Sequence, residues 1–156
     1  MLRNFTTRFG IITLLVLFFS PSLTLASETD GTIDATNKYA WSENAGWLNF
    51  GTGVGAGDVH VTDAGLTGYV WTEQNGWVNL SPTNSGVTID SAGNLADFAW
   101  GEQTGYIDFS NASIDANGIF HGTATNTITG TITFDCTNCL VETDYRPADF
   151  RSGGDG

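Results

Sequence analysis

Three aromatic residues, Trp47, Trp77 and Tyr106, stand 30 and 29 residues apart in the chain. Two positions after each comes a side chain that can hydrogen-bond: Asn49, Asn79 and Asp108. The flat face of an aromatic ring packs against apolar C–H surface, and an amide can bind hydroxyl groups, so this pattern indicates a ring platform that could bind a carbohydrate. The competing interpretation is that a second layer of the protein covers these rings as part of the core.

A series of carboxylates recurs with the same period, at Glu43, Glu73 and Glu102. Two carboxylates can cleave a glycosidic bond, but a catalytic pair is normally one asymmetric arrangement, whereas these acids recur at equivalent turns. The sequence also contains no HExxH motif and no glycine-rich phosphate-binding loop. We therefore expect a protein that is not an enzyme.

Aspartates at the turns between expected strands are candidates for calcium binding, because hard cations prefer oxygen ligands. These residues are Asp34, Asp63, Asp90 and Asp115. No EF-hand loop accompanies them, and aspartate is common at the start of a turn because it hydrogen-bonds to the main chain. We therefore expect no metal or cofactor, with calcium as the alternative.

The two cysteines, Cys136 and Cys139, stand where a turn would join ITFD to LVETDY. In an exported chain this spacing favours a disulfide across a tight turn. A redox CxxC motif normally opens a helix after a strand, and a zinc site needs two further ligands, for which the chain offers only His60 and His121.

The strands and turns that must position these residues are expected in a twelve-residue segment that occurs in three similar copies along the chain. YAWSENAGWLNF begins at residue 39, YVWTEQNGWVNL at residue 69 and FAWGEQTGYIDF at residue 98. β-Branched and aromatic residues dominate and no helical periodicity is present, so each copy predicts two strands joined by a turn. A fixed period of about 30 residues is typical of repeat architectures.

The central four residues of each copy predict a hairpin loop whose last residue, Gly46, Gly76 or Gly105, has a positive φ. A four-residue loop pairs Trp71 with Val78 and places one wholly apolar face on each hairpin. That apolar face would contain Tyr39, Trp41, Leu48, Phe50, Tyr69, Trp71, Val78, Leu80, Phe98, Trp100, Ile107 and Phe109. We therefore expect Trp41, Trp71 and Trp100 to be more buried than the rings of the platform.

The N-terminus and the charge indicate where the protein acts. Residues 1–26 combine Arg3 and Arg8 with the apolar run IITLLVLFF and a small-residue end at Ala26, which is typical of a secretory signal peptide. Its removal leaves 3 basic and 17 acidic residues, a net charge of −14. So acidic a surface argues against nucleic acid and anionic lipid as partners. We expect an extracellular or cell-surface location, with the periplasm as an alternative and no membrane insertion after cleavage.

The wording WSENAGWLNF, WTEQNGWVNL and GEQTGYIDF, with a closing VETDYRP, resembles the WSENxGW-type β-repeats of secreted and cell-surface bacterial proteins, most of them uncharacterised. The resemblance covers most of the chain after the leader. It implies an extracellular β-repeat protein and brings no catalytic residues with it.

Together these observations predict an all-β protein of tandem antiparallel hairpins, stacked as a β-sandwich or a short β-solenoid. The expected boundaries are a leader at 1–26, one domain at 27–147 and a disordered tail at 148–156. Within the domain we expect repeats at 31–57, 58–86, 87–112 and 113–135 and a closing hairpin at 132–146. The first functional expectation is a structural or adhesive protein that associates edge to edge with itself, because a stacked array ends in unpaired strands. The alternative is a carbohydrate-binding module that uses the ring platform to bind an extracellular glycan.

Overall fold

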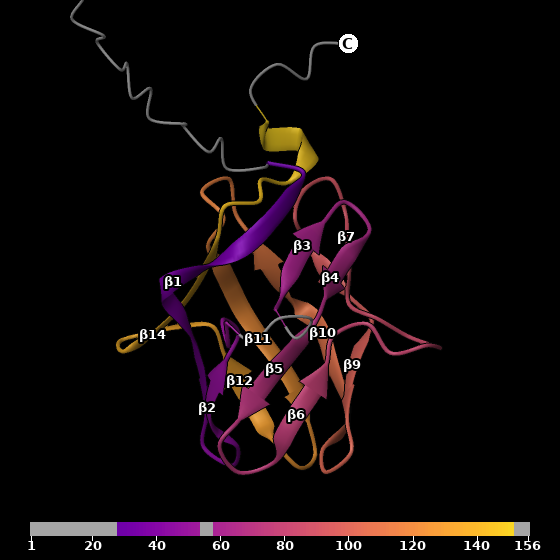
Figure 1. Ribbon diagram of the computed structural model, residues 1–156, viewed down its shortest axis with the longest axis vertical. Helices are drawn as coiled ribbons and strands as arrows, with labels where there is room; N and C mark the ends of the chain where they lie inside the picture. Colours follow the sequence, from indigo (N-terminus) through magenta and orange to yellow (C-terminus); the bar gives the residue numbers. More distant parts are fainter. Residues whose placement is uncertain (1–27, 54–57, 152–156) are drawn as a thin grey trace, which may run out of the picture.

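The computed structural model describes residues 28–53 and 58–151. The expected leader lies outside these residues. The described chain consists of β-strands and one three-residue 3₁₀ helix, so the predicted all-β class is confirmed. Eight strands form one closed antiparallel barrel (Figure 1). They are β1 (Asp30–Ser42), β2 (Gly46–Asn49), β5 (Tyr69–Thr72), β6 (Gly76–Asn79), β9 (Phe98–Gly101), β10 (Gly105–Ile114), β11 (Phe120–Asn126) and β12 (Gly130–Thr133).

The closure of this barrel corrects the expected sandwich or solenoid. The strand order runs β12-β11-β10-β9-β6-β5-β2-β1, and β12 then pairs with β1, where Ser42 faces Ile132 and Trp41 faces Thr133. Strands twist, so a sheet of eight can curl until its two ends pair, and its interior is then just wide enough for side chains to fill. The hairpins bury their apolar side chains inside one barrel rather than against a second sheet.

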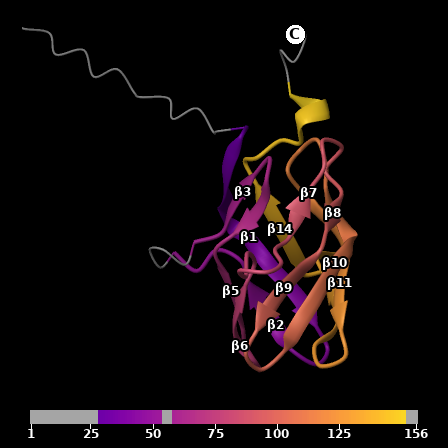
Figure 2. The same ribbon diagram turned by 90° about the vertical axis from the view of Figure 1, so that its right-hand side faces the viewer.

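The remaining elements lie at one end of the barrel and along its side (Figures 1 and 2). They are β3 (His60–Thr62), β4 (Gly65–Thr67), β7 (Thr88–Ile89), β8 (Leu95–Ala96), β13 (Asp135–Cys136), β14 (Cys139–Thr143) and η2 (Ala148–Phe150). The first four and η2 lie at the end away from the loops of the repeated hairpins. In contrast, β14 pairs with β1 along the side of the barrel, and β13 pairs with β14.

The register within each repeated hairpin differs by one residue from the prediction. Trp71 pairs with Trp77 and Thr72 with Gly76, so the loop has three residues and not four. The other two copies have the same register, with Trp41 opposite Trp47 and Trp100 opposite Tyr106. The glycines do have the predicted positive φ, 72°, 74° and 71° at Gly46, Gly76 and Gly105. A glycine in this conformation closes a three-residue loop as a bulge that still pairs with the opposite strand.

The one-residue difference places the first strand of each hairpin with its other face inward, because side chains alternate along a strand, while the second strand buries the side chains that were expected. The barrel interior receives Val70 and Val78 of the second hairpin, and Ala40 and Ala99 at the equivalent positions, all of them buried. The expected apolar face of Trp41, Trp71 and Trp100 with Val78 is therefore wrong. Those tryptophans lie on the outside.

Four aromatic side chains pack together in the core, and two of them, Phe50 and Phe109, belong to the predicted apolar face. The ring centroid of Phe134 lies 5.7 Å from that of Phe50, 5.8 Å from Phe120 and 5.9 Å from Phe109. All four rings are at most 2% exposed. This cluster joins the first and third hairpins to the fourth, β11–β12, which the threonine-rich segment after residue 113 forms.

The C-terminal segment is anchored by a buried tyrosine. The Tyr145 hydroxyl donates to Asp63, and the Arg151 guanidinium also bonds to Asp63. Burial, followed by the Asp63 carboxylate, raises the pKa of Tyr145 to about 12, which keeps the hydroxyl a donor. Residues 148–151, expected to be disordered, therefore form a short helix and an ordered contact, while residues 152–156 lie outside the described chain.

Candidate functional site

Nine aromatic side chains lie on the outer surface of the three repeated hairpins. We call this surface the aromatic face; it consists of Tyr39, Trp41, Trp47, Tyr69, Trp71, Trp77, Phe98, Trp100 and Tyr106. Eight of them are 37–56% exposed, and Trp47 is half-buried. The strands that carry them are neighbours in the barrel, in the order β1, β2, β5, β6, β9 and β10, so the rings form one continuous surface.

The rings of each hairpin support one another across the strand pair. The centroids of Trp41 and Trp47 are 4.9 Å apart, and those of Trp71 and Trp77 are 5.0 Å apart, with the rings edge to face in both pairs. Directly opposite side chains in an antiparallel pair approach this closely, and edge-to-face packing suits the charge distribution of aromatic rings. Within the described residues, each ring contact on this face joins two side chains of the same hairpin.

The polar residues of the predicted platform share this face and have a local role. The side-chain oxygens of Asn49, Asn79 and Asp108 accept the main-chain N–H two residues onward, at 3.0, 2.9 and 2.8 Å. The hydroxyl and the N–H of Ser110 lower the pKa of Asp108, so this group stays ionised. The Nδ2 groups of Asn49 and Asn79 have no partner in the described chain and are free to donate.

Two equivalent hollows lie between consecutive hairpins. The first, of about 600 Å³, is lined by Tyr39, Trp47 and Asn49 of one hairpin and by Trp71 and Glu73 of the next. The second, of about 530 Å³, is lined by Tyr69, Trp77 and Asn79 and by Trp100 and Glu102. Each residue of the second list stands at the position of its counterpart in the first. The two hollows thus share five equivalent lining positions, while Asn138 also lines the first, and Trp71, Asn75, Gly76 and Gln103 also line the second.

The carboxylates of the two hollows, Glu73 and Glu102, differ in their hydrogen bonds. Glu73 accepts the main-chain N–H of Trp47 at 2.9 Å and donates its own N–H to the Trp47 carbonyl at 3.1 Å. It thereby ties the second hairpin to the first. In the second hollow the equivalent carboxylate, Glu102, makes no hydrogen bond or ion pair in the described part of the chain. The turn acids are therefore not interchangeable.

The sequence placed Trp47, Trp77 and Tyr106 on one face together with Asn49, Asn79 and Asp108, and the structure brings all six to the aromatic face. The sequence prediction missed the other six rings of this face, because the expected four-residue loop assigned them to the core. A signal was present: small residues at positions 40 and 99 are poor partners for a core built from tryptophan, but they suit a narrow barrel interior.

Three of the four turn aspartates considered for calcium accept main-chain N–H groups, and the fourth, Asp63, binds the side chains of Tyr145 and Arg151. Asp34 accepts the N–H groups of Asn37 and Thr36, which lower the pKa of its carboxyl. Asp90 and Asp115 each accept two main-chain N–H groups in the same way. No group of three histidine, cysteine, aspartate or glutamate side chains suited to a metal ion occurs within residues 28–53 and 58–151.

One histidine lies between two carboxylates on the opposite wall of the barrel. Nδ1 of His121 is 2.6 Å from Asp135, and Nε2 is 3.1 Å from Asp115. The hydrogen bond to Asp135, followed by that to Asp115, raises the pKa of the imidazole. Both ring nitrogens are occupied, so this arrangement acts as an ion-pair cluster that holds β11 against β13.

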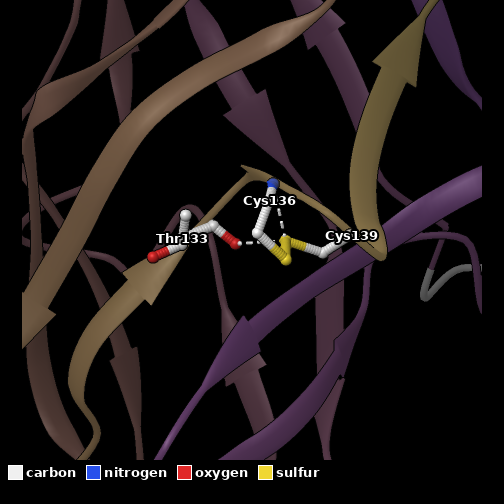
Figure 3. Close-up of a disulfide and its surroundings, with 3 residues drawn as sticks. All are labelled: Thr133, Cys136 and Cys139. Carbon is white, nitrogen blue, oxygen red and sulfur yellow. Dashed lines mark hydrogen bonds between the residues drawn. A yellow bond between two sulfur atoms is a disulfide. The ribbon is translucent and has the colours of Figure 1, made fainter.

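The two cysteines form a disulfide in the turn between β13 and β14, with Cα atoms 4.8 Å apart (Figure 3). The Cys136 N–H points at Cys139 Sγ, which also lies 3.5 Å from the Thr133 carbonyl. The turn closed by this disulfide contains Asn138, which also lines the first hollow. The disulfide thus fixes a polar edge of the candidate site.

Comparison of this chain with protein-family models, with curated proteins and with solved structures finds no match. Across the described ranges, no helix is long and apolar enough to cross a membrane.

Proposed function

We propose that the protein binds an extracellular glycan through its aromatic face, without catalysing a reaction on it. The observation that carries this proposal is the pair of equivalent hollows, each bounded by Tyr, Trp and Asn of one hairpin and Trp and Glu of the next. A ligand that presents the same chemical unit repeatedly, as a polysaccharide does, matches a surface that repeats its own subsite.

The size of the exposed apolar surface supports a binding role. Eight rings at 37–56% exposure leave roughly 700 Å² of aromatic surface in water, if each ring offers about 200 Å². The largest apolar patch on an ordinary monomer is about 300–600 Å² and is often functional. Leaving so many tryptophans exposed forgoes stabilisation that burial would supply, which is understandable if a ligand covers them.

The chemistry of the hollows suits sugars. Ring faces can pack on the C–H surface of a sugar ring, while the unpaired Nδ2 groups of Asn49 and Asn79 can donate to its hydroxyl oxygens. Because the two amide oxygens already accept main-chain N–H groups, the orientation of each amide is fixed before a ligand arrives. Such preorganisation reduces the entropy that binding costs.

Edge-to-edge self-association, the other function expected from the sequence, has less support in this fold. Since β12 pairs with β1, the eight barrel strands have partners on both sides, and a closed barrel removes the edges that another copy would extend. A net charge of −12 for the whole chain also opposes the approach of identical copies.

We place the protein outside the cytoplasm because it has a predicted leader and a disulfide, which persists in oxidising compartments.

The direct test compares two single-ring variants in binding to a panel of insoluble and soluble polysaccharides. Trp77→Ala should weaken binding at least about tenfold, since truncating a central contact ring usually costs more than 1 kcal/mol. The matched control is Phe150→Ala, which removes another ring that is 49% exposed but lies on η2 away from the aromatic face. If no polysaccharide of the panel binds, or if both variants bind as the parent does, the proposal fails.

Light scattering distinguishes the self-association alternative. A parent protein that stays monomeric at high concentration and high salt, and that binds glycan, fits the proposal. Salt-dependent growth of large particles that Trp77→Ala leaves unchanged would instead favour assembly through another surface.

A further inference from the structure

The second hollow is lined by an exposed carboxylate that the protein does not satisfy. The Glu102 carboxylate has no partner in the described chain, whereas Glu73 at the equivalent position of the first hollow holds the N–H of Trp47. The surroundings of the neighbouring glycines show the same difference. A side chain at Gly46 would meet the Glu73 carboxylate, but at Gly76 the nearest atom would be Trp71 Cζ3, at 3.9 Å. Glu102 therefore does not turn back onto the main chain as Glu73 does.

A second acceptor borders the same hollow. Asn75 lines it, and the Oδ1 atom of Asn75 is buried with no hydrogen-bond partner in the described chain. A buried acceptor without a donor is costly, so native proteins normally satisfy it. That amide oxygen is buried, so the unpaired acceptor that a ligand in this hollow can contact beside Trp77 and Trp100 is the exposed Glu102 carboxylate.

The cationic side chains of the described residues are all engaged elsewhere. The Lys38 ammonium donates to the Gly51 carbonyl, while Arg146 and Arg151 hold the C-terminal segment against Tyr145 and Asp63. Lys38 also lies over the ring of Tyr39, with 5.6 Å between Nζ and the ring centroid. The aromatic face thus already contacts one ammonium group, and that group comes from the first hairpin.

We propose that the second hollow binds a protonated amine of the glycan, so that the ligand is an amino-sugar polymer with free ammonium groups. An ammonium group is attracted to the faces of tryptophan rings and pairs with a carboxylate, and it supplies the donor that the Glu102 carboxylate lacks. The acidic chain attracts such a ligand and repels sulfated or uronic-acid glycans. This inference rests on the proposed glycan-binding function and specifies its ligand.

The test is a calorimetric titration with three oligosaccharides of matched length: a β-linked glucosamine oligomer, its fully N-acetylated counterpart and a β-linked glucose oligomer. The buffer is mildly acidic, so that the amines are protonated. We expect the glucosamine oligomer to bind about tenfold more tightly than the other two, as one ring contact and one exposed ion pair would give. Glu102→Gln removes the ion pair and should reduce this preference to about threefold, the share of the ring contact, while keeping the affinity for the acetylated oligomer.

The matched control is Glu43→Gln, which changes the net charge equally at the equivalent turn of the first hairpin, outside both hollows. If the three oligomers bind equally and Glu102→Gln changes nothing, the amine proposal is overturned and the glycan proposal stands. If none of them, nor any polysaccharide of the wider panel, binds, both fail. If poly-lysine binds as tightly as the glucosamine oligomer and with the same dependence on Glu102, the amine source is a protein, and the assignment to an amino sugar is wrong.

Discussion

Glycine-to-alanine changes in two equivalent hairpins measure the contact between hairpins that Glu73 makes. Gly46 and Gly105 have nearly the same φ, 72° and 71°, so alanine at either position must adopt a left-handed conformation. That conformation costs about 1–2 kcal/mol, reduced somewhat because alanine also restricts the unfolded chain. The two sites differ in their surroundings. Nothing lies within 4 Å of an added Cβ at Gly105, whereas at Gly46 it would displace the Glu73 carboxylate.

The displaced carboxylate would lose its 2.9 Å hydrogen bond from the Trp47 N–H. A hydrogen bond of this kind contributes about 1 kcal/mol net, and its donor here is near the surface, where water can replace the acceptor. We therefore expect Gly105→Ala to destabilise the protein by about 1 kcal/mol and Gly46→Ala by about 2 kcal/mol.

Urea denaturation followed by tryptophan fluorescence resolves a difference of this size. The decisive comparison is a double-mutant cycle, in which Glu73→Ala removes the obstructing side chain before Gly46 is changed. In that background the cost of Gly46→Ala should fall to the cost of Gly105→Ala. Equal losses at Gly46 and Gly105 in the parent protein would show that the Glu73 contact does not join the hairpins and would refute the reasoning.

Two further predictions concern the core and the histidine cluster. Phe134→Ala should lower the free energy of unfolding by about 3–5 kcal/mol, because Phe134 is fully buried among three other rings. Phe150→Ala should lower it by less than about 0.5 kcal/mol, because Phe150 is exposed. Thermal unfolding of both variants checks this, and similar losses would contradict the assignment of the core. Because the pKa of His121 is raised above its ordinary 6.5, its charged form contributes stability that is complete below pH 6.5 and is lost as the pH rises through the folded pKa. The free energy of unfolding should therefore decline over that window in the parent and decline less in His121→Gln, and a parent profile that rises there would contradict the raised pKa.

The sequence alone determined the local features of this protein. Alternating β-branched and aromatic residues specify strands, and Gly46, Gly76 and Gly105 specify positive φ because glycine lacks the Cβ that resists it. The spacing of Cys136 and Cys139 allows a disulfide without reference to the rest of the fold. Each of these features depends on interactions within about ten residues. The repeated positions of Trp47, Trp77 and Tyr106 likewise identified three of the nine rings of the aromatic face and the polar residues beside them.

The tertiary structure decided which face of each hairpin is buried. A glycine with positive φ fits both a four-residue loop and the bulge that closes a three-residue loop, and the two choices differ by one residue in register. The choice depends on what the barrel can hold: the interior accepts Ala40, Val70 and Ala99 but has no room for Trp41, Trp71 and Trp100 at the opposite positions of the alternation. That limit is set by the pairing of Ser42 with Ile132, two residues far apart in the chain, which closes the barrel and fixes its width. No local pattern encodes that pairing, because it results from the combined twist of eight strands.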